Sequence, residues 1–269
     1  MPFSVLISIY AKEQPAFFKE SLDSILNQSC RPNEIVLIKD GPLTKDLETI
    51  ITEYRDNPII KIISLPQNQG LGKALNIGLN HCSYDLVARM DTDDISKPNR
   101  FERQIDYMVN HPEIAVCGSW IEEFEDSTDN VLSVKKVPQT HEEISRYIKS
   151  RNPLNHPSVI FRKSAVQSVG GYKHFPLFED WYLWARMFAN GAQFANIQES
   201  LLYFRTSKDM YKRRGGLKYA KDSAKFQWTL HKLGIISVPA ALKSSMLRGL
   251  VYLMPNGLRK LIYSKFLRS

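Results

Sequence analysis

The stretch RMDTDD at residues 89–94 places three carboxylates, Asp91, Asp93 and Asp94, within four positions, directly after a short apolar run. Like charges this close repel each other, and burial strengthens the repulsion. The arrangement therefore requires either open solvent or a compensating cation. Carboxylate oxygens are ligands for Mg²⁺ and Mn²⁺, and a cation held there can bridge and neutralise a diphosphate. Because Asp also caps turns and helices, the spacing alone leaves a metal site and a solvated turn both open.

Two further polar stretches follow apolar runs in the same way. In KDGP, Asp40 can accept a hydrogen bond from a ribose hydroxyl or a base, although an Asp-Gly pair is also a strong turn signal. In NQGLGKALN, Gly70, Gly72 and Lys73 stand at a loop-to-helix junction, and a helix N-terminus attracts phosphate. A helix with a flexible entry and no ligand is the alternative for this second stretch.

Residues 179 and 180 offer a different chemistry. FEDWYLW puts the carboxylates of Glu179 and Asp180 before an aromatic-rich helix, where one of them can act as general base on an acceptor hydroxyl. Acids in a first turn also complement the helix dipole without any catalytic role. His156, in NHPSVIFRKS, is a candidate metal ligand or phosphate contact, and a structural histidine is the alternative.

The elements that must position these residues alternate along the first 95 positions. Apolar runs predict strands at 3–9, 34–40, 59–65 and 84–90, and helical spacing predicts helices at 14–27, 43–54 and 71–80. This alternation indicates a parallel sheet with right-handed crossovers, whose ligands bind at the carboxyl ends of the strands. The sequence has no G-x-G-x-x-G after the first strand and no G-x-x-x-x-G-K-[ST], which disfavours an ordinary dinucleotide fold and a P-loop.

After Lys97 the pattern is less regular. We expect two paired strands at 114–124 and 131–137, a strand at 158–164, and helices at 98–110, 141–150 and 179–191. From about residue 212 the chain is predicted to be helical and basic. The expected division is an α/β body over 1–211, with halves at 1–95 and 96–211, and an extension over 212–269.

Composition narrows the class of protein. The chain has 269 residues and is 43% hydrophobic, which is enough for a sizeable core. Its three cysteines are far apart and lack C-x-x-C spacing, so a disulfide framework or zinc site is not expected and a reducing cytoplasm is. The N-terminus MPFSVLISIY has no basic region and no cleavage site, so we expect a core strand there and no signal peptide. No apolar run reaches the roughly 18 residues of a spanning helix.

The net charge of +8 is unevenly distributed. Residues 208–269 hold 14 Lys or Arg and two acids, a net charge of +12. The first 207 residues hold 22 Lys or Arg and 26 acids, a net charge of −4. A basic tail favours an anionic partner such as a membrane, a nucleic acid or a phosphate-bearing substrate. Residues 242–269 contain no acid and mix leucines with basic residues on both sides of Pro255-Asn256-Gly257. This pattern predicts an interfacial anchor on anionic lipid, and a helix packed on the body or across a dimer is the alternative.

Taken in order, these stretches resemble the family 2 glycosyltransferases of bacterial polysaccharide assembly. The resemblance runs from about Val5 to Arg214 and rests on SIYAKE, IKDGP, NQGLGKALNIGL, RMDTDD, HPSVIFRKS, GGY and EDWYLWARM. The later LLYFRTSKDMYKRRGG and the basic tail resemble the subgroup that makes exopolysaccharide or O-antigen repeat units, including amylovoran-type enzymes.

The resemblance implies a GT-A fold, with a nucleotide-binding half before residue 96 and an acceptor half after it. It also implies Mn²⁺ or Mg²⁺, a UDP-sugar donor, inversion at the anomeric carbon and an acceptor saccharide on a polyprenyl diphosphate. Such an enzyme would be peripheral on the inner face of the bacterial cytoplasmic membrane, would not bind nucleic acid, and is a possible homodimer.

Site residues are carried over position by position from the same resemblance. It implies a nucleoside site formed by Ser8, Tyr10, Glu13, Asp40 and Lys73, with Asp91 near ribose or metal, Asp93 as main metal ligand and Asp180 as base beside Glu179. A separate hypothesis, from the charge that the leaving diphosphate develops, is that Arg205, Arg213 or Arg214 closes over phosphate after donor binding, with Gly215-Gly216 as a mobile loop. A solvated basic helix start is the alternative. In the second strand the chain departs from the commoner D-D-G-S pattern, because position 39 is Lys. One acidic contact that the family makes to the nucleoside is therefore missing from this chain.

Two other function classes share part of this sequence pattern. A nucleotidyltransferase also combines an α/β sheet with paired acids, but it needs a glycine-rich basic loop near the first strand, and SIYAKEQP is not one. A non-catalytic nucleic-acid binder would use the basic tail and leave Asp91, Asp93, Glu179 and Asp180 without a role. The sequence does not specify which sugar is transferred.

Overall fold

The computed structural model describes residues 1–206 and 215–254. Its first part is a parallel sheet in the strand order β3-β2-β1-β4. The strands are β1 (Phe3–Ile9), β2 (Glu34–Lys39), β3 (Ile60–Ser64) and β4 (Leu86–Met90), and the crossover helices are α1 (Pro15–Leu26), α2 (Lys45–Glu53) and α3 (Leu71–His81). The predicted alternation of strand and helix is confirmed, and no boundary differs from the predicted one by more than two residues.

The sheet then continues with mixed strand directions. β4 pairs antiparallel with β8 (Ile160–Arg162), followed by β6 (Ile114–Phe124), β9 (Gln193–Arg205) and the short β5 (Ile95–Ser96). The expected pairing of β6 with β7 (Val131–Lys135) is confirmed and is antiparallel. The long strand β9 was not predicted. It runs parallel to β6 with three register shifts, so its side chains do not keep the two-residue period by which a strand is recognised.

The second set of helices also differs from prediction in places. The helices are α4 (Arg100–Asn110), α5 (His141–Tyr147), α6 (Lys163–Ser168) and α7 (Glu179–Ala189). Pro98 precedes α4, because Asn99 is its N-cap residue. The predicted strand 158–164 is shorter, since residues 156–158 form a 3₁₀ turn and Lys163 already begins α6.

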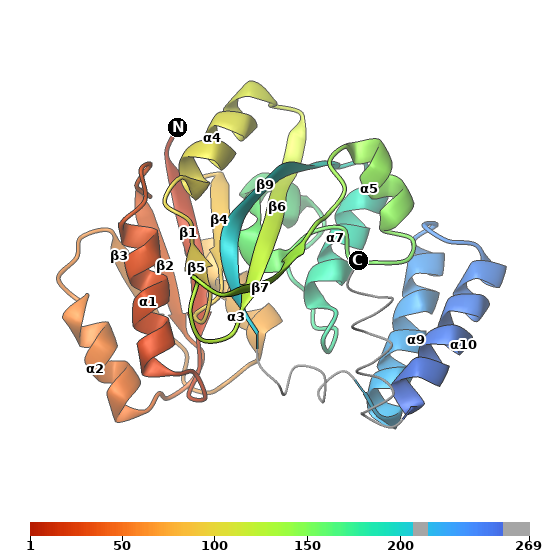
Figure 1. Cartoon of the computed structure of the whole chain (residues 1–269), viewed down its shortest axis with the longest axis horizontal. Coiled ribbons are helices and arrows are strands. Elements are labelled where there is room, and N and C mark those ends of the chain that lie inside the picture. Colours follow the sequence, from red (N-terminus) through yellow and green to blue (C-terminus); the bar gives the residue numbers. More distant parts are fainter. Residues whose placement is uncertain (207–214, 255–269) are drawn as a thin grey trace.

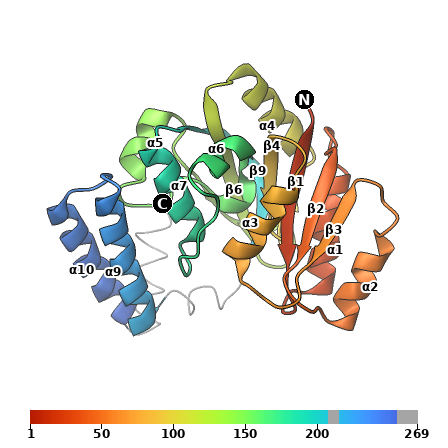
Figure 2. The same cartoon turned by 180° about the vertical axis from the view of Figure 1, so that it is seen from behind.

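Two hydrophobic clusters cover opposite faces of the sheet. Alternate side chains of β1 point to different clusters: Val5 and Ile7 pack with α1, α2 and α4, while Leu6 packs with α3 and α7. Figures 1 and 2 show α1, α2 and α4 on one face of the sheet and α3, α6 and α7 on the other. Burial on both faces explains why β1, β2 and β4 are largely apolar runs in the sequence.

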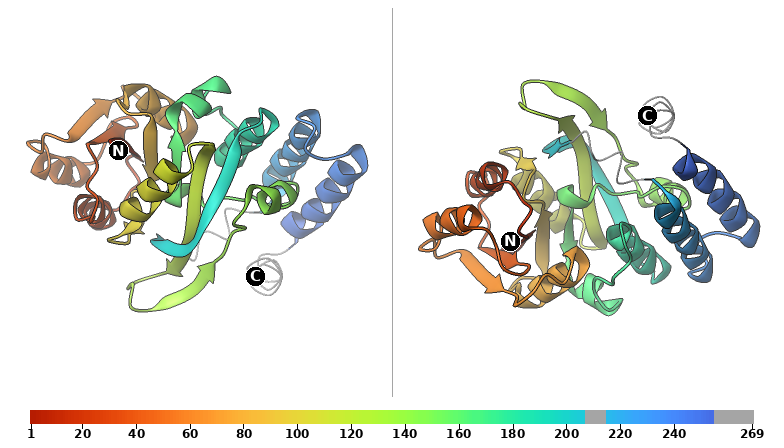
Figure 3. Two further views of the ribbon diagram at one scale, coloured as in Figure 1. Left: turned by 90° about the horizontal axis from the view of Figure 1, so that it is seen from above. Right: turned by 90° about the horizontal axis from the view of Figure 1, so that it is seen from below.

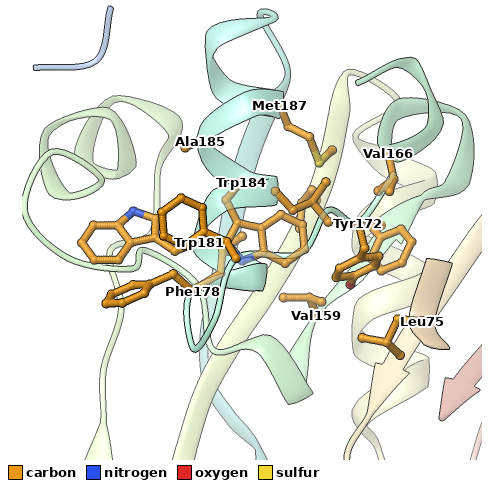
Figure 4. Packing of buried hydrophobic residues seen from close by; sticks show 14 of the residues in the cluster. Leu75, Val159, Val166, Tyr172, Phe178, Trp181, Trp184, Ala185 and Met187 are labelled. Carbon is orange, nitrogen blue, oxygen red and sulfur yellow. The ribbon is translucent and has the colours of Figure 1, made fainter. Parts of the chain in front are cut away.

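The C-terminal extension forms a helical hairpin of α9 (Leu217–Lys232) and α10 (Val238–Leu253), which lies beside α7 (Figures 1 and 3). Phe226 of α9 stacks on Phe178 with ring centroids 4.9 Å apart and lies 4.7 Å from Trp181. Figure 4 shows Phe178 and Trp181 next to each other in the buried aromatic cluster at the start of α7. In the part of the chain that the structure describes, no helix has the length and apolarity needed to cross a bilayer. The predicted second piece of the tail, after Pro255, lies outside the described residues.

Candidate active site

A cavity of about 960 Å³ lies at the carboxyl ends of β1, β2 and β4, at the sheet edge where a ligand site was predicted. The predicted site residues that line it are Ser8, Tyr10, Glu13, Asp40, Asp91, Asp93 and Glu179. Glu125 and Asp126, at the end of β6, and Phe204, Arg205 and Thr206, at the end of β9, complete part of its wall. These later residues were missed or given another role, because they belong to a strand that the sequence did not reveal and to a hairpin with no recognisable motif.

Asp91 and Asp93 of RMDTDD line this cavity, and Asp94 is fully buried beside them. Ligand atoms of Asp91, Asp93 and Asp94 all lie within 4.8 Å of one another. Burial, followed by repulsion from Asp91, raises the pKa of Asp93 to about 6, and burial also raises the pKa of Asp94 well above its usual value. Oxygen ligands, mutual repulsion and partial burial fit a divalent cation, which would offset all three unfavourable charges. Of the three predicted ligands, this group contains Asp91 and Asp93, and it has Asp94 in place of His156.

Two buried arginines fix the strand end that carries this cluster. Arg89 is 1% exposed and pairs with Asp91. Arg100, which is fully buried, donates to the carbonyl oxygen of Arg89 over 2.7 Å and to the hydroxyl of Ser96 over 3.0 Å. Burial lowers the pKa of Arg100 to about 9. The cluster therefore projects from a strand end held by charged groups that are themselves buried.

Arg205 closes the same turn from the other side. Its backbone N–H donates to Asp94 over 2.9 Å, its Nε donates to the carbonyl of Asp93 over 2.9 Å, and its guanidinium pairs with Glu20. The guanidinium also lies 3.9 Å from the ring centroid of Phe17. Arg205 was one of the residues predicted to close over phosphate, and in the structure it braces the acidic turn. Arg213 and Arg214 lie outside the described residues.

Asp40 sits at the end of β2 and is 4% exposed. Its two carboxylate oxygens accept hydrogen bonds from the backbone N–H groups of Gln69, at 2.7 Å, and Gly70, at 3.0 Å. It therefore holds the loop before α3 in place, and it also lines the cavity. Lys39 pairs with Glu48 on α2, which accounts for a basic residue at this position of the motif.

Three predicted residues, Lys73, His156 and Asp180, are not among those that line the cavity. Lys73 is exposed on α3. The Nε2 atom of His156 lies 3.0 Å from the hydroxyl of Tyr172, and its ring lies 6.0 Å from that of Trp184. Burial, and then the charge of Arg89, lower the pKa of His156 well below its usual value. Among the described residues, the group able to hold a metal consists of the three aspartates and does not include His156.

Glu179 and Asp180 begin α7 and have different surroundings. Glu179 lines the cavity. Asp180 accepts a hydrogen bond of 2.6 Å from Nδ2 of Asn152 and one of 2.7 Å from the backbone N–H of Trp181. Burial raises the pKa of both carboxyl groups. Asn152 was not predicted, and its only signal was its place in a proline-flanked turn.

The GGY loop at residues 170–172 links α3 to the C-terminal part of α7. Oδ1 of Asn76, on α3, accepts from the backbone N–H of Tyr172 over 3.0 Å, and Arg186 of α7 donates to the carbonyl of Gly171 over 2.7 Å. Gly171 has a φ of +67°, and a β-carbon there would lie 1.9 Å from Oδ1 of Asn76. Only glycine fits both the backbone conformation and this contact.

Gly171→Ala is therefore expected to destabilise the protein by about 2–5 kcal/mol, from the left-handed backbone cost and the overpacking together. Gly191 has a φ of +82° and open space around it, so Gly191→Ala is the matched control and should cost only about 1–2 kcal/mol. Urea unfolding of both variants measures the difference. Equal losses for the two would show that the contact with Asn76 contributes nothing.

Comparison with known proteins places this geometry in a family. The family model described as Glycosyl transferase family 2 matches residues 4–169, more than half of the chain. The chain belongs to the family 2 glycosyltransferases. The match spans the sheet edge, Asp40 and the aspartate cluster, and it ends just before the GGY loop.

Relatives of similar length extend the likeness to the whole chain of this family 2 enzyme. An Escherichia coli protein named UDP-Gal:alpha-D-GlcNAc-diphosphoundecaprenol beta-1,3-galactosyltransferase is 42% identical over 266 residues, covering 99% of this chain and 96% of its own. Amylovoran biosynthesis glycosyltransferase AmsE of Erwinia amylovora is 38% identical over 271 residues, covering 98% of each. The predicted likeness to exopolysaccharide and amylovoran-type enzymes is confirmed.

A solved structure supports the fold. The mannosyltransferase PcManGT from Pyrobaculum calidifontis, in complex with GDP-Man and Mn²⁺, superposes with a TM-score of 0.66 at 14% identity, covering 98% of this chain and 79% of that one. The mixed sheet flanked by helices is the predicted GT-A fold.

Proposed function

We propose that this glycosyltransferase moves a hexose or N-acetylhexosamine from a UDP-sugar to a saccharide carried on a polyprenyl diphosphate, with inversion, in O-antigen or exopolysaccharide synthesis. The observation that carries the proposal is one cavity lined by Asp91 and Asp93, directly after β4, and by Glu179, the neighbour of Asp180 at the start of α7. The name of the Escherichia coli relative supports a UDP-hexose donor and a lipid-linked acceptor, and favours galactose as the first sugar to test.

The donor would lie along the strand ends. Ser8, Tyr10, Glu13 and Asp40 form the wall on the nucleoside side, and Gly70 keeps the adjacent loop close through its bond to Asp40. Asp91, Asp93 and Asp94 would hold Mn²⁺ or Mg²⁺, which supplies Lewis-acid stabilisation of the departing diphosphate when it is bound. The Mn²⁺ in the complex of the archaeal mannosyltransferase supports this cofactor class.

The acceptor would be activated at α7. Asp180 would take the proton of the attacking hydroxyl as that oxygen bonds to C1 from the face opposite the leaving nucleotide. Asn152 and the N–H of Trp181 orient its carboxylate, and each carboxylate oxygen keeps a lone pair for the proton. Glu179, on the cavity wall, would contact the acceptor or the donor sugar. Inversion of an α-linked donor gives a β-linkage.

Titration calorimetry with UDP, once with Mn²⁺ and once with EDTA, tests the donor half of the proposal. We expect binding that requires the metal, followed by turnover of UDP-galactose with a synthetic GlcNAc-diphosphate-lipid acceptor. A folded protein that binds neither UDP nor another nucleoside diphosphate would contradict the proposal. Formation of a nucleotide-sugar from a sugar phosphate would favour the nucleotidyltransferase alternative instead.

The chemistry also constrains where the enzyme works. An acceptor anchored by a polyprenyl chain remains at a bilayer surface, so the cavity must operate there. We therefore infer peripheral association with the inner face of the cytoplasmic membrane, where nucleotide-sugars are available.

A further inference from the structure

The outer face of α10 is apolar. Six large apolar side chains on this helix are exposed, at fractions between 41% and 63%: Val238, Leu242, Met246, Leu247, Leu250 and Leu253. We call these six residues the α10 ridge. Five of them follow one another at spacings of three or four positions, so they form one continuous stripe. A helix on the surface of a water-soluble domain normally shows its polar face there.

The orientation of α10 is fixed by its inner face. Ala241 and Tyr252 are buried, and the ring of Tyr252 meets that of Tyr219 on α9 with centroids 4.6 Å apart. Arg248 also points inward, where it donates to the carbonyl of Ser150 and lies 5.6 Å from the ring of Trp181. The helix thus turns an arginine toward the body and leucines away from it, and rotation about its axis would break these contacts.

The charge around the ridge is positive. Residues 215–254 carry six basic side chains (Lys218, Lys221, Lys225, Lys232, Lys243 and Arg248) and one acid, Asp222. Four of these lysines lie on the exposed side of the neighbouring helix α9 with Trp228, which is 38% exposed. The chain continues directly from the ridge into residues 255–269, which contain four basic residues and no acid.

We propose that the α10 ridge is a membrane-docking surface that inserts its leucines into the interfacial region of an anionic bilayer. Apolar side chains on one helix face with lysines beside them complement acyl chains and anionic headgroups together. A second copy of the chain is a poorer occupant, because a two-fold contact on the ridge would bring the lysine-rich hairpins of both copies together. The biological purpose assigned to this surface rests on the proposed lipid-linked acceptor, but vesicle binding can be measured without it.

The test uses the full chain and vesicles of phosphatidylcholine with about one-third phosphatidylglycerol, with pure phosphatidylcholine as comparison. In the ridge variant, Leu242→Gln, Met246→Gln and Leu250→Gln are combined, since all three side chains are exposed and Gln is a good helix former. The matched control combines Val131→Thr, Leu132→Thr and Val134→Thr on β7, which are also exposed apolar residues but lie on a distant hairpin.

We expect the ridge variant to bind anionic vesicles at least about tenfold more weakly than the parent, and the β7 variant to bind as the parent does. Parent binding should be weaker on pure phosphatidylcholine and at high salt. Both variants should keep their UDP affinity, which shows that the fold is intact. Unchanged vesicle binding by the ridge variant would overturn the proposal. So would a ridge variant that changes only from dimer to monomer in sedimentation.

Failure of the proposed function gives a different result. A chain that binds anionic vesicles through the ridge, yet transfers no sugar to a short water-soluble diphosphate acceptor, would retain the docking surface and lose the proposed acceptor class.

Discussion

Asp180→Asn is expected to reduce kcat by about 10²–10⁴-fold while UDP affinity stays unchanged. Asparagine has the same shape and keeps an oxygen to accept from Asn152 or Trp181, so the start of α7 should remain in place. What is lost is the basic oxygen that takes the proton of the acceptor hydroxyl. Steady-state transfer with the lipid-diphosphate acceptor measures kcat, and calorimetry with UDP measures donor binding.

Glu179→Gln is the comparison that separates the two carboxylates. Glu179 lines the cavity, so its loss should raise KM for donor or acceptor and lower kcat by a smaller factor than the loss at Asp180. If Glu179→Gln proves the more damaging of the two for kcat, the roles of base and neighbour must be exchanged. An Asp180→Asn variant with parental kcat would remove Asp180 from the mechanism.

The pH profile provides an independent check on this assignment. Burial raises the pKa of Asp180, and a general base works only when it is deprotonated. Activity should therefore be lost as the pH falls through a value above that of an ordinary aspartate, and be retained on the alkaline side of it. This acid limb should be absent from the residual activity of the Asp180→Asn enzyme.

Asp93→Asn is expected to abolish the metal dependence of donor binding and to raise the stability of the metal-free protein. The three aspartates repel one another across less than 4.8 Å, and burial adds to the penalty. Removing one charge relieves that penalty but also removes a ligand. The parent should gain about 2.7 kcal/mol of stability at a Mn²⁺ concentration of 100 times Kd, and the variant should gain far less.

Thermal unfolding with Mn²⁺ and with EDTA measures both effects. Asp126→Asn is the matched control, because Asp126 lines the same cavity but is not a member of the metal-binding group. Its response to Mn²⁺ should equal that of the parent. A full Mn²⁺-induced rise in Tm in the Asp93→Asn protein would place the cation elsewhere.

The parts of this fold that the sequence predicts are those with a regular period. β1, β2 and β4 are largely apolar runs because they are buried on both faces, and the crossover helices α1 to α3 show a helical spacing of apolar residues. β9 escaped prediction because its register against β6 shifts three times. It supplies Arg205, whose bonds to Asp93 and Asp94 link residues more than 100 positions apart. No local pattern encodes such a contact.

In the site, too, residues that belong to a local motif were predicted and residues placed by distant contacts were not. Asp40, Asp91, Asp93 and Glu179 reach the cavity as predicted because motifs at strand ends and helix starts determine where they project. Asn152 was missed because an asparagine in a turn carries no signal of the carboxylate it will orient. Residue type and neighbouring motifs also suggested His156 and Lys73 as ligands, but neither lines the cavity, because packing decides which way a side chain points.

Helix α3 connects the two sides of the reaction. Its entry loop is bonded to Asp40, a β-carbon at Gly72 would lie 3.3 Å from Cγ of Glu179, and Asn76 holds the backbone of Tyr172. The cavity wall that would face the nucleotide and the helix that would carry the base are thus both in contact with one helix, α3. A change of sugar or acceptor during evolution would accordingly arise from new side chains at the rim, since the angle between donor and acceptor walls is not free to vary.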